Sequence, residues 1–351
     1  MKFSWRWFGD EDNISLEKIN QIPGLTGIVT AIYDQPAGTV WSIEKITKLV
    51  QRINNYNLEL TAIESVPVPE EIKLGSPDRD SYIEVWKENL QNLSSLGIEV
   101  VCYNFMPAFD WFRTDLQKPL MDGSNSLFFS QKELNKKPLE DLVDLPGWDS
   151  NYSFNEVSSL INKYKELGEE GLWDNLEYFL KRVVPVAENY GIKLGIHPDD
   201  PPWEILGLPR IIKDKEALSR VVNIIDSESN GLAICTGSLG ANEKNSIPEI
   251  LKYFSKKGKL NFVHLRNIKH FGDKEFQETA HYSSSGSLDM FEIMKILVET
   301  DYSGPIRPDH GRMIWDEKGR PGYGLYDRAL GHSYILGLYE ALIKGSGNFY
   351  G

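Results

Sequence analysis

The chain has 351 residues, of which 25% are charged, and its formal net charge is −13. So acidic a protein is poorly suited to nucleic acid or an anionic membrane surface, and no apolar run reaches the ~18–20 residues of a membrane span. Two cysteines cannot form a disulfide framework, and the N-terminus lacks the apolar core of a secretory signal, so we expect a cytoplasmic protein.

Short apolar runs recur along the first third of the chain, and most of them precede residues with helical periodicity. Ser42 is a good N-cap for a helix predicted at 42–57, although Lys45 stands where a capping box needs Glu or Gln. A second helix is predicted at 80–96. The predicted strands lie at residues 2–8, 27–33, 58–66 and 98–105.

A long interval follows at residues 107–170, and it contains Trp111 and the loop-like sequence MDGSNS. Because long loops often carry function, we interpret it as an elaborated loop over the active face, with a decorative insertion as the alternative. Amphipathic helices are predicted at 172–190 and 325–343. The later predicted strands lie at residues 192–197, 231–236, 260–265 and 305–309.

These runs are apolar almost throughout, which is typical of parallel strands whose outer face is covered by helices. Eight such units close naturally into a (β/α)8 TIM barrel, here with a long inserted segment after strand 4. The alternative is an open doubly wound sheet, but no G-x-G-x-x-G follows the first strand. The composition changes nowhere sharply, so we predict one domain that spans residues 1–351.

Four consecutive predicted strands end in residue types that bind metals, namely His197, Cys235, His264 and Asp309. Each alone has an ordinary structural explanation, as a hydrogen-bonded histidine, a buried thiol or a helix-capping carboxylate. Strand ends converge in a barrel, and the chain has only six histidines and two cysteines, so the joint pattern predicts one metal ion. The ligand types suit zinc or iron and tolerate manganese, and a catalytic ion needs a free position for substrate.

Other strand-end residues suit a pocket around this metal. Side chains alternate along a strand, so Arg266 and Arg307, each two residues from a candidate ligand, can point inward beside it. An ordinary ion pair explains both arginines equally well. The earlier strands end in polar and aromatic residues that can line a polyol pocket. These are Arg6, Trp7, Tyr33, Glu64 and Asn104.

Two further residues are acid/base candidates. His310 directly follows Asp309, and an imidazole, whose ordinary pKa is about 6.5, exchanges protons near neutral pH. Tyr323 lies in RPGYGLYD, where glycine and proline favour a tight turn, although tyrosine in such a loop usually serves surface packing. The pair Asp199–Asp200 follows the fifth strand, and it either supports the metal site or is solvated charge.

Several segments of the chain together resemble the mannonate dehydratase family of glucuronate degradation. They are MKFSWRWFG, GIHPDDPPW, AICTGSLG, FVHLRN, HYSSSGSLDM and IRPDHGR followed by GYGLYDRALG. The resemblance runs from the first strand to the last helix. It implies a metal-dependent hydro-lyase that converts D-mannonate to 2-keto-3-deoxy-D-gluconate with Mn²⁺ or Fe²⁺.

Carried over residue by residue, the resemblance makes the same four strand-end residues the metal ligands. It makes His310 and Tyr323 the acid/base pair, without saying which is the base. It also implies a small sugar acid as substrate, and it leaves a homodimer open.

Three other functions are alternatives to a dehydratase. A metal-dependent sugar isomerase of the same barrel class usually has more carboxylate ligands, and Cys235 argues against it. A phosphodiesterase would hold two or three ions. A non-catalytic sugar-acid binding barrel has no need of both His310 and Tyr323.

Overall fold

The computed structural model describes residues 1–137 and 154–345 of the chain. Eight parallel strands close into a barrel in the order β1-β12-β9-β8-β7-β4-β3-β2, which confirms the predicted TIM barrel. The described barrel strands coincide with the predicted ones to within a few residues at each end. They are β1 (Lys2–Arg6), β2 (Gly27–Thr30), β3 (Glu59–Glu64), β4 (Val100–Tyr103), β7 (Lys193–Ile196), β8 (Asn230–Cys235), β9 (Leu260–Leu265) and β12 (Pro305–Pro308).

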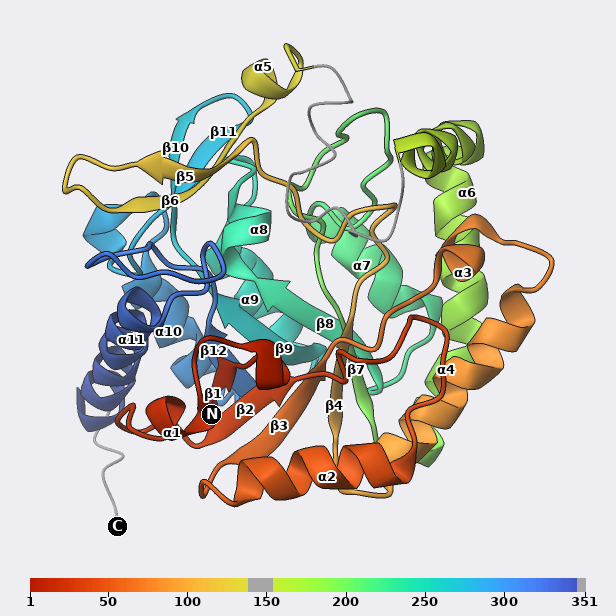
Figure 1. The fold of residues 1–351 in the computed structure, drawn as a ribbon, viewed down its shortest axis with the longest axis horizontal. Coiled ribbons are helices and arrows are strands. Elements are labelled where there is room, and N and C mark those ends of the chain that lie inside the picture. Colours follow the sequence, from red (N-terminus) through yellow and green to blue (C-terminus); the bar gives the residue numbers. More distant parts are fainter. Residues whose placement is uncertain (138–153, 346–351) are drawn as a thin grey trace.

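Helices surround the barrel, as Figure 1 shows for α2, α4, α6 and α11. The predicted N-cap is present, because Ser42 Oγ accepts a hydrogen bond from the backbone N–H of Lys45 at 3.3 Å. No helix among the described residues is long and apolar enough to cross a membrane. The helices are α1 (Leu16–Ile19), α2 (Ile43–Asn54), α3 (Glu70–Leu74), α4 (Arg79–Ser94), α5 (Gln131–Leu134), α6 (Phe154–Asn189), α7 (Lys215–Ile224), α8 (Thr236–Gly240), α9 (Ile247–Lys256), α10 (Met290–Glu299) and α11 (Leu325–Gly345).

Helix α6 begins well before the predicted 172–190, so that boundary is wrong. Its first part buries Val157, Leu160, Ile161 and Tyr164, which have the i, i+3, i+4, i+7 spacing of an amphipathic helix. Gly168 has φ 69°, in the left-handed region, and separates this part from the rest of α6. Part of the 107–170 interval is therefore helix rather than loop.

A second, antiparallel sheet lies beside the barrel and was not predicted. Its strands are β5 (Asp115–Pro119), β6 (Asn125–Ser130), β10 (Ile268–Gly272) and β11 (Glu275–Glu278), in the order β10-β11-β6-β5. Figure 1 shows the two hairpins side by side, one from the 107–170 interval and one from the segment after β9. The end of β11 thereby comes close to the barrel strands that carry the predicted metal ligands.

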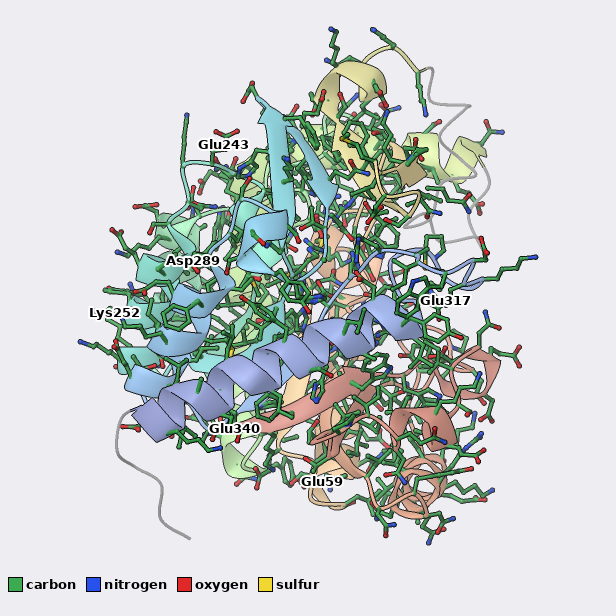
Figure 2. The ribbon with its side chains drawn as sticks, turned by 90° about the vertical axis from the view of Figure 1, so that its left-hand side faces the viewer. Glu59, Glu243, Lys252, Asp289, Glu317 and Glu340 are labelled. Carbon is green, nitrogen blue, oxygen red and sulfur yellow. The ribbon has the colours of Figure 1, made fainter. Side chains whose placement is uncertain are left out.

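The last helix is fixed at the end that faces the site. The carboxylate of Glu317 accepts hydrogen bonds from the backbone N–H groups of Leu325 and Tyr326, at 2.6 and 3.3 Å, in the first turn of α11. Figure 2 shows Glu317 beside this end of the helix and Glu340 toward the other. The loop between β12 and α11, which contains Tyr323, is thus held at both of its ends.

Candidate metal and acid–base site

Neighbouring barrel strands bring the predicted metal ligands together. His264 of β9 is the register partner of Cys235 at the end of β8, and His197 directly follows β7. The ligand atoms of these three residues all lie within 4.8 Å of one another. Asp309 follows β12, and its Oδ2 is 3.3 Å from Cys235 Sγ. The donor atoms of two imidazoles and a thiol therefore gather at the carboxyl ends of the strands, and the Asp309 carboxylate lies beside the thiol, outside that group.

This donor set fits a divalent transition metal. Nε2 of His264 is buried and hydrogen-bonds to no described residue, although Glu64 Oε2 is 3.4 Å away. Burial lowers the pKa of His197 and so favours the neutral imidazole that binds metals. Burial alone would raise the pKa of Asp309, but Arg307, His310 and Arg266 outweigh it, so the carboxyl group stays ionised.

A second group of potential ligands lies next to the first and shares His264. It adds Glu64 and Cys102. Two guanidinium groups already contact Glu64: Arg307 donates at 2.9 and 3.0 Å, and Arg6 lies 3.0 Å away. Burial raises the pKa of Cys102 well above its ordinary value and keeps the thiol neutral. A cation is therefore held less well here than among His197, Cys235 and His264.

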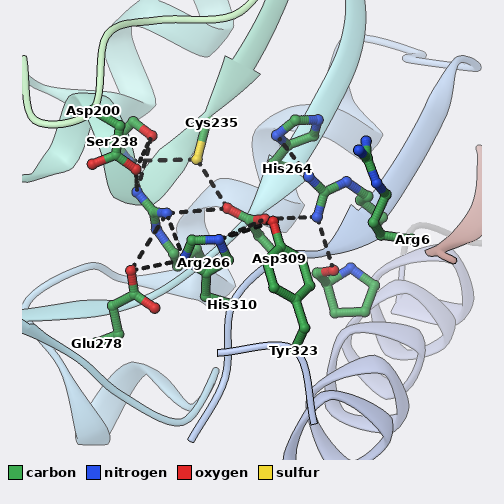
Figure 3. A network of polar contacts seen from close by, with 12 residues as sticks. Arg6, Asp200, Cys235, Ser238, His264, Arg266, Glu278, Asp309, His310 and Tyr323 are labelled. Atoms are coloured by element: carbon green, nitrogen blue, oxygen red, sulfur yellow. Dashed lines mark hydrogen bonds and ion pairs between the residues drawn. The ribbon is translucent and has the colours of Figure 1, made fainter. Parts of the chain in front are cut away.

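Both predicted arginines point inward, and both form ion pairs. Nη1 of Arg307 donates to Asp309 Oδ1 at 2.6 Å, and Nη1 of Arg266 lies 3.3 Å from Oδ2 of the same carboxylate. Figure 3 shows Arg266 beside Asp309. Gly237 of AICTGS leaves the space for one of them, because a Cβ there would lie 2.1 Å from Arg266 Nε. The arginines therefore fix the orientation of the carboxylate.

His310 and Tyr323 contact each other directly. Nε2 of His310 lies 2.9 Å from the Tyr323 hydroxyl, across the site in Figure 3. The backbone N–H of Gly311 donates to Gly322 O at 2.8 Å and holds the tyrosine loop against the segment after β12. Gly322 has φ 78°, so a residue with a side chain would be strained there. The glycine-rich loop thus presents the phenol to the imidazole.

The other nitrogen of His310 meets a residue that sequence reasoning missed. Nδ1 lies 2.8 Å from Oε1 of Glu278, which is the last residue of β11 and fully buried. Arg113, also not predicted, donates to Glu278 at 2.7 Å and to both oxygens of Asp200, at 2.8 and 3.1 Å. Asp200 is thus a buried ion-pair partner, not solvated charge. No local pattern marks Glu278, since its partners lie far away in the chain.

A cavity of about 270 Å³ opens between these groups. Arg6 and Asn104 line it, as predicted, and Asn104 Nδ2 donates to Asp110 Oδ1 at 3.0 Å. Trp7 does not line it, because its ring packs against Arg52 with the guanidinium carbon 5.2 Å from the ring centre. The lining also contains His197, Arg266, Arg307, Asp309, His310 and Tyr323, together with the unpredicted Phe8, Trp111 and Arg320.

A second cavity, of about 350 Å³, lies at the amino ends of the barrel strands. Lys2, Glu59 and Lys193 are among its lining residues, and this lining contains neither histidine nor cysteine. Active sites of (β/α)8 barrels lie at the carboxyl ends. The candidate acid/base pair accordingly lines the cavity at the carboxyl ends, not this one.

Comparison with known proteins gives matches over almost the whole chain. The family model of D-mannonate dehydratase (UxuA) matches residues 1–348. Mannonate dehydratase 2 of Halalkalibacterium halodurans is 50% identical over 343 residues, which are 97% of this chain and 99% of that protein. The mannonate dehydratase of Streptococcus agalactiae serotype V is 51% identical over 347 residues, 99% of this chain and 100% of the relative. A crystal structure of mannonate dehydratase from Streptococcus suis serotype 2 superimposes with a TM-score of 0.93 at 48% identity, covering 99% of this chain and 96% of that one.

Proposed function

The chain belongs to the D-mannonate dehydratase family, and on this basis we propose that its barrel converts D-mannonate to 2-keto-3-deoxy-D-gluconate at the cavity of His310 and Tyr323. One observation carries the proposal: the hydrogen-bonded pair of His310 and Tyr323 lines the same cavity as His197 and Asp309, two of the candidate metal ligands. A sugar isomerase and a non-catalytic binding barrel are not favoured, because the family matches residues 1–348.

We propose His197, Cys235, His264 and Asp309 as the ligands of one divalent ion, either Mn²⁺ or Fe²⁺. The close approach of the donor atoms of His197, Cys235 and His264, and the 3.3 Å between Asp309 Oδ2 and Cys235 Sγ, support this set. When bound, the ion supplies Lewis acidity that stabilises negative charge on the substrate carboxylate and an adjacent hydroxyl. Cys102 and Cys235 are both free thiols, which fits a cytoplasmic location.

The chain's own residues then divide the proton transfers. Nε2 of His310 takes the proton from C2, and the electrons of that C–H bond become the C2=C3 double bond. Tyr323 gives its hydroxyl proton to the C3 hydroxyl, which leaves as water. The resulting enol tautomerises to the 2-keto acid. Burial, and next the Asp309 carboxylate, raise the pKa of Tyr323, so the phenol starts the reaction protonated.

The hydrogen bond between the two residues also returns them to their starting states. After water leaves, His310 is protonated and Tyr323 is a phenolate. Since Nε2 and the phenol oxygen lie 2.9 Å apart, the proton can pass directly from one to the other. No solvent molecule is needed for this step, which suits a site whose imidazole is 3% exposed.

The other lining residues contact and orient the sugar acid. We assign this role to Arg6, Arg266, Arg307 and Asn104, each of which lines the cavity and carries hydrogen-bond donors. The three arginines already hold carboxylates, which fixes their guanidinium groups in place before substrate arrives. Trp7 is left out, because its ring lies away from the cavity.

The decisive experiment is incubation of anaerobically purified protein with D-mannonate and Mn²⁺. We expect a 2-keto-3-deoxy acid, detected chemically, and one metal ion per chain by elemental analysis. Absence of this product with Mn²⁺, Fe²⁺ and every other divalent ion tested would overturn the proposed function. Two or three ions per chain would instead favour a phosphodiesterase-like site.

A further inference from the structure

We propose that Glu278 is a positioning residue, whose carboxylate holds the proton of His310 on Nδ1 and so leaves Nε2 as the basic nitrogen. The inference rests on the proposed function, because it concerns the base of that reaction. The small antiparallel sheet then contributes to catalysis, because Glu278 is the last residue of its strand β11.

Two groups compete for Nδ1 of His310, and they favour opposite tautomers. Glu278 Oε1, an acceptor, lies 2.8 Å away, whereas Nη1 of Arg266, which can only donate, lies 3.1 Å away. The arginine alone would favour a lone pair on Nδ1 and a proton on Nε2. That tautomer could not accept a proton from C2. The closer carboxylate therefore decides which nitrogen is basic.

The surrounding contacts keep this carboxylate ionised and fixed. Burial alone would raise the pKa of Glu278, but His310, Arg113 and Arg266 outweigh it, so the pKa is lowered. Arg113 donates to Oε1 through Nη2 at 2.7 Å and through Nε at 3.2 Å. The backbone is held as well, because Ser126 Oγ of β6 donates to Glu278 O at 2.6 Å.

The same arrangement stabilises His310 once it has taken a proton. A buried imidazolium is costly unless a negative charge lies beside it. Glu278 supplies this charge, since its Oε1 lies 2.8 Å from Nδ1, and Asp309 Oδ1 lies 3.9 Å from Nε2. A buried carboxylate behind a catalytic histidine works in this way in other enzymes.

The test combines a tautomer measurement with kinetics. Long-range ¹H–¹⁵N spectra of the full-length protein loaded with diamagnetic Zn²⁺ report which ring nitrogen of each of the six histidines carries the proton. The His310 signals are assigned by their loss in His310→Asn. We expect His310 to be protonated on Nδ1 in the wild type and to lose that preference in Glu278→Gln.

Kinetics with D-mannonate and Mn²⁺ provide the second readout. We expect Glu278→Gln to lower kcat on the order of 10²- to 10⁴-fold while KM and the metal content change less than about threefold. Glu275→Gln is the matched control: it lies on the same strand, but its carboxylate accepts from Ser130 Oγ, away from the cavity. This variant should retain wild-type kcat.

Each outcome bears on a different claim. A wild-type His310 protonated on Nε2 overturns the inference even if Glu278→Gln does not fold. So does a Glu278→Gln variant that retains wild-type kcat, or one that raises KM and loses metal without lowering kcat. A wild type that makes no product from D-mannonate overturns the proposed function, and the spectra still report the tautomer.

Discussion

At the scale of single residues, the site depends on the contact between two complementary groups, the imidazole of His310 and the phenol of Tyr323. The Tyr323 hydroxyl lies 2.9 Å from Nε2 of His310, and Glu278 lies at the other ring nitrogen, Nδ1. The sequence predicted both residues, but the family resemblance rather than the spacing singled out the tyrosine. Their direct contact at 2.9 Å is a new finding, because the length and path of a glycine-rich loop do not reveal where its side chains point.

Loss of either member of this pair should remove most of the turnover. We expect His310→Asn and Tyr323→Phe each to lower kcat on the order of 10²- to 10⁴-fold, because each removes one proton transfer. Steady-state rates with D-mannonate and elemental analysis test this, and the metal content should stay at one ion per chain. Tyr326→Phe is a matched control, since Tyr326 is 42% exposed and packs against Trp315 on the surface. Wild-type kcat in His310→Asn would contradict the assignment.

The two cysteines offer an internal comparison for the metal site. Cys235→Ala should lower metal affinity by at least about tenfold, because it removes one donor atom from the first coordination shell. Cys102→Ala should retain the ion, since the raised pKa of that thiol keeps it neutral. Titration of metal-free protein with Mn²⁺ measures both. A larger loss in Cys102→Ala than in Cys235→Ala would show that the ion lies nearer to Glu64 and Cys102.

At the scale of elements, the barrel was predictable and the small sheet was not. Each barrel strand is largely buried on both faces, so it appears as a short apolar run, and four of the eight carry a proposed metal ligand near their carboxyl ends. No residue of β5 (DLQKP) is fully buried and most of them are polar, and β6 pairs with β11 through Glu275 and Ser130, residues far apart in the chain. Non-local pairing of this kind leaves no periodicity in the sequence. Glu278 and Arg113 were missed for the same reason.

Helix boundaries were predicted where a capping residue marks them. Ser42→Ala should lower the free energy of unfolding by about 1 kcal/mol, because the backbone N–H of Lys45 then loses its acceptor. Ser42→Asp retains an acceptor and should stay within a few tenths of a kcal/mol of the wild type. Urea denaturation monitored by circular dichroism measures both, and kcat should not change. An equally stable Ser42→Ala would show that the cap contributes nothing to α2.

At the scale of the whole molecule, the proposed metal ion would join strands that the chain keeps far apart. His197, Cys235, His264 and Asp309 follow or end four adjacent barrel strands, so an ion that binds them stabilises the folded barrel. Removal of metal by a chelator should lower the thermal midpoint, and added Mn²⁺ should restore it. At 100 times Kd, the gain in stability is about 2.7 kcal/mol. Cys235→Ala should respond much less to added Mn²⁺, whereas an unchanged midpoint in the metal-free wild type would contradict the linkage.

Acid should lower the stability of the folded protein, because low pH protonates carboxylates that form buried ion pairs. Burial alone would raise the pKa of Asp200, but Arg113 and Arg266 outweigh it and lower the pKa far below its ordinary value; that of Glu278 is lowered as well. In the unfolded chain both groups titrate near about pH 4. A carboxyl group whose pKa is depressed by folding contributes stability that is present above its unfolded pKa and is lost as the pH falls. These two residues connect the segment after β7, the strand β9 and the small sheet, so their protonation loosens contacts between all three.

In the presence of a chelator, which removes the pH dependence of metal binding, the urea midpoint should stay level from pH 7 to about pH 5 and then fall steadily toward pH 3. Glu278→Gln should show a shallower fall, because one of the two titrating groups is gone. A midpoint that is the same at pH 6 and pH 3 would show that the buried carboxylates do not stabilise the fold.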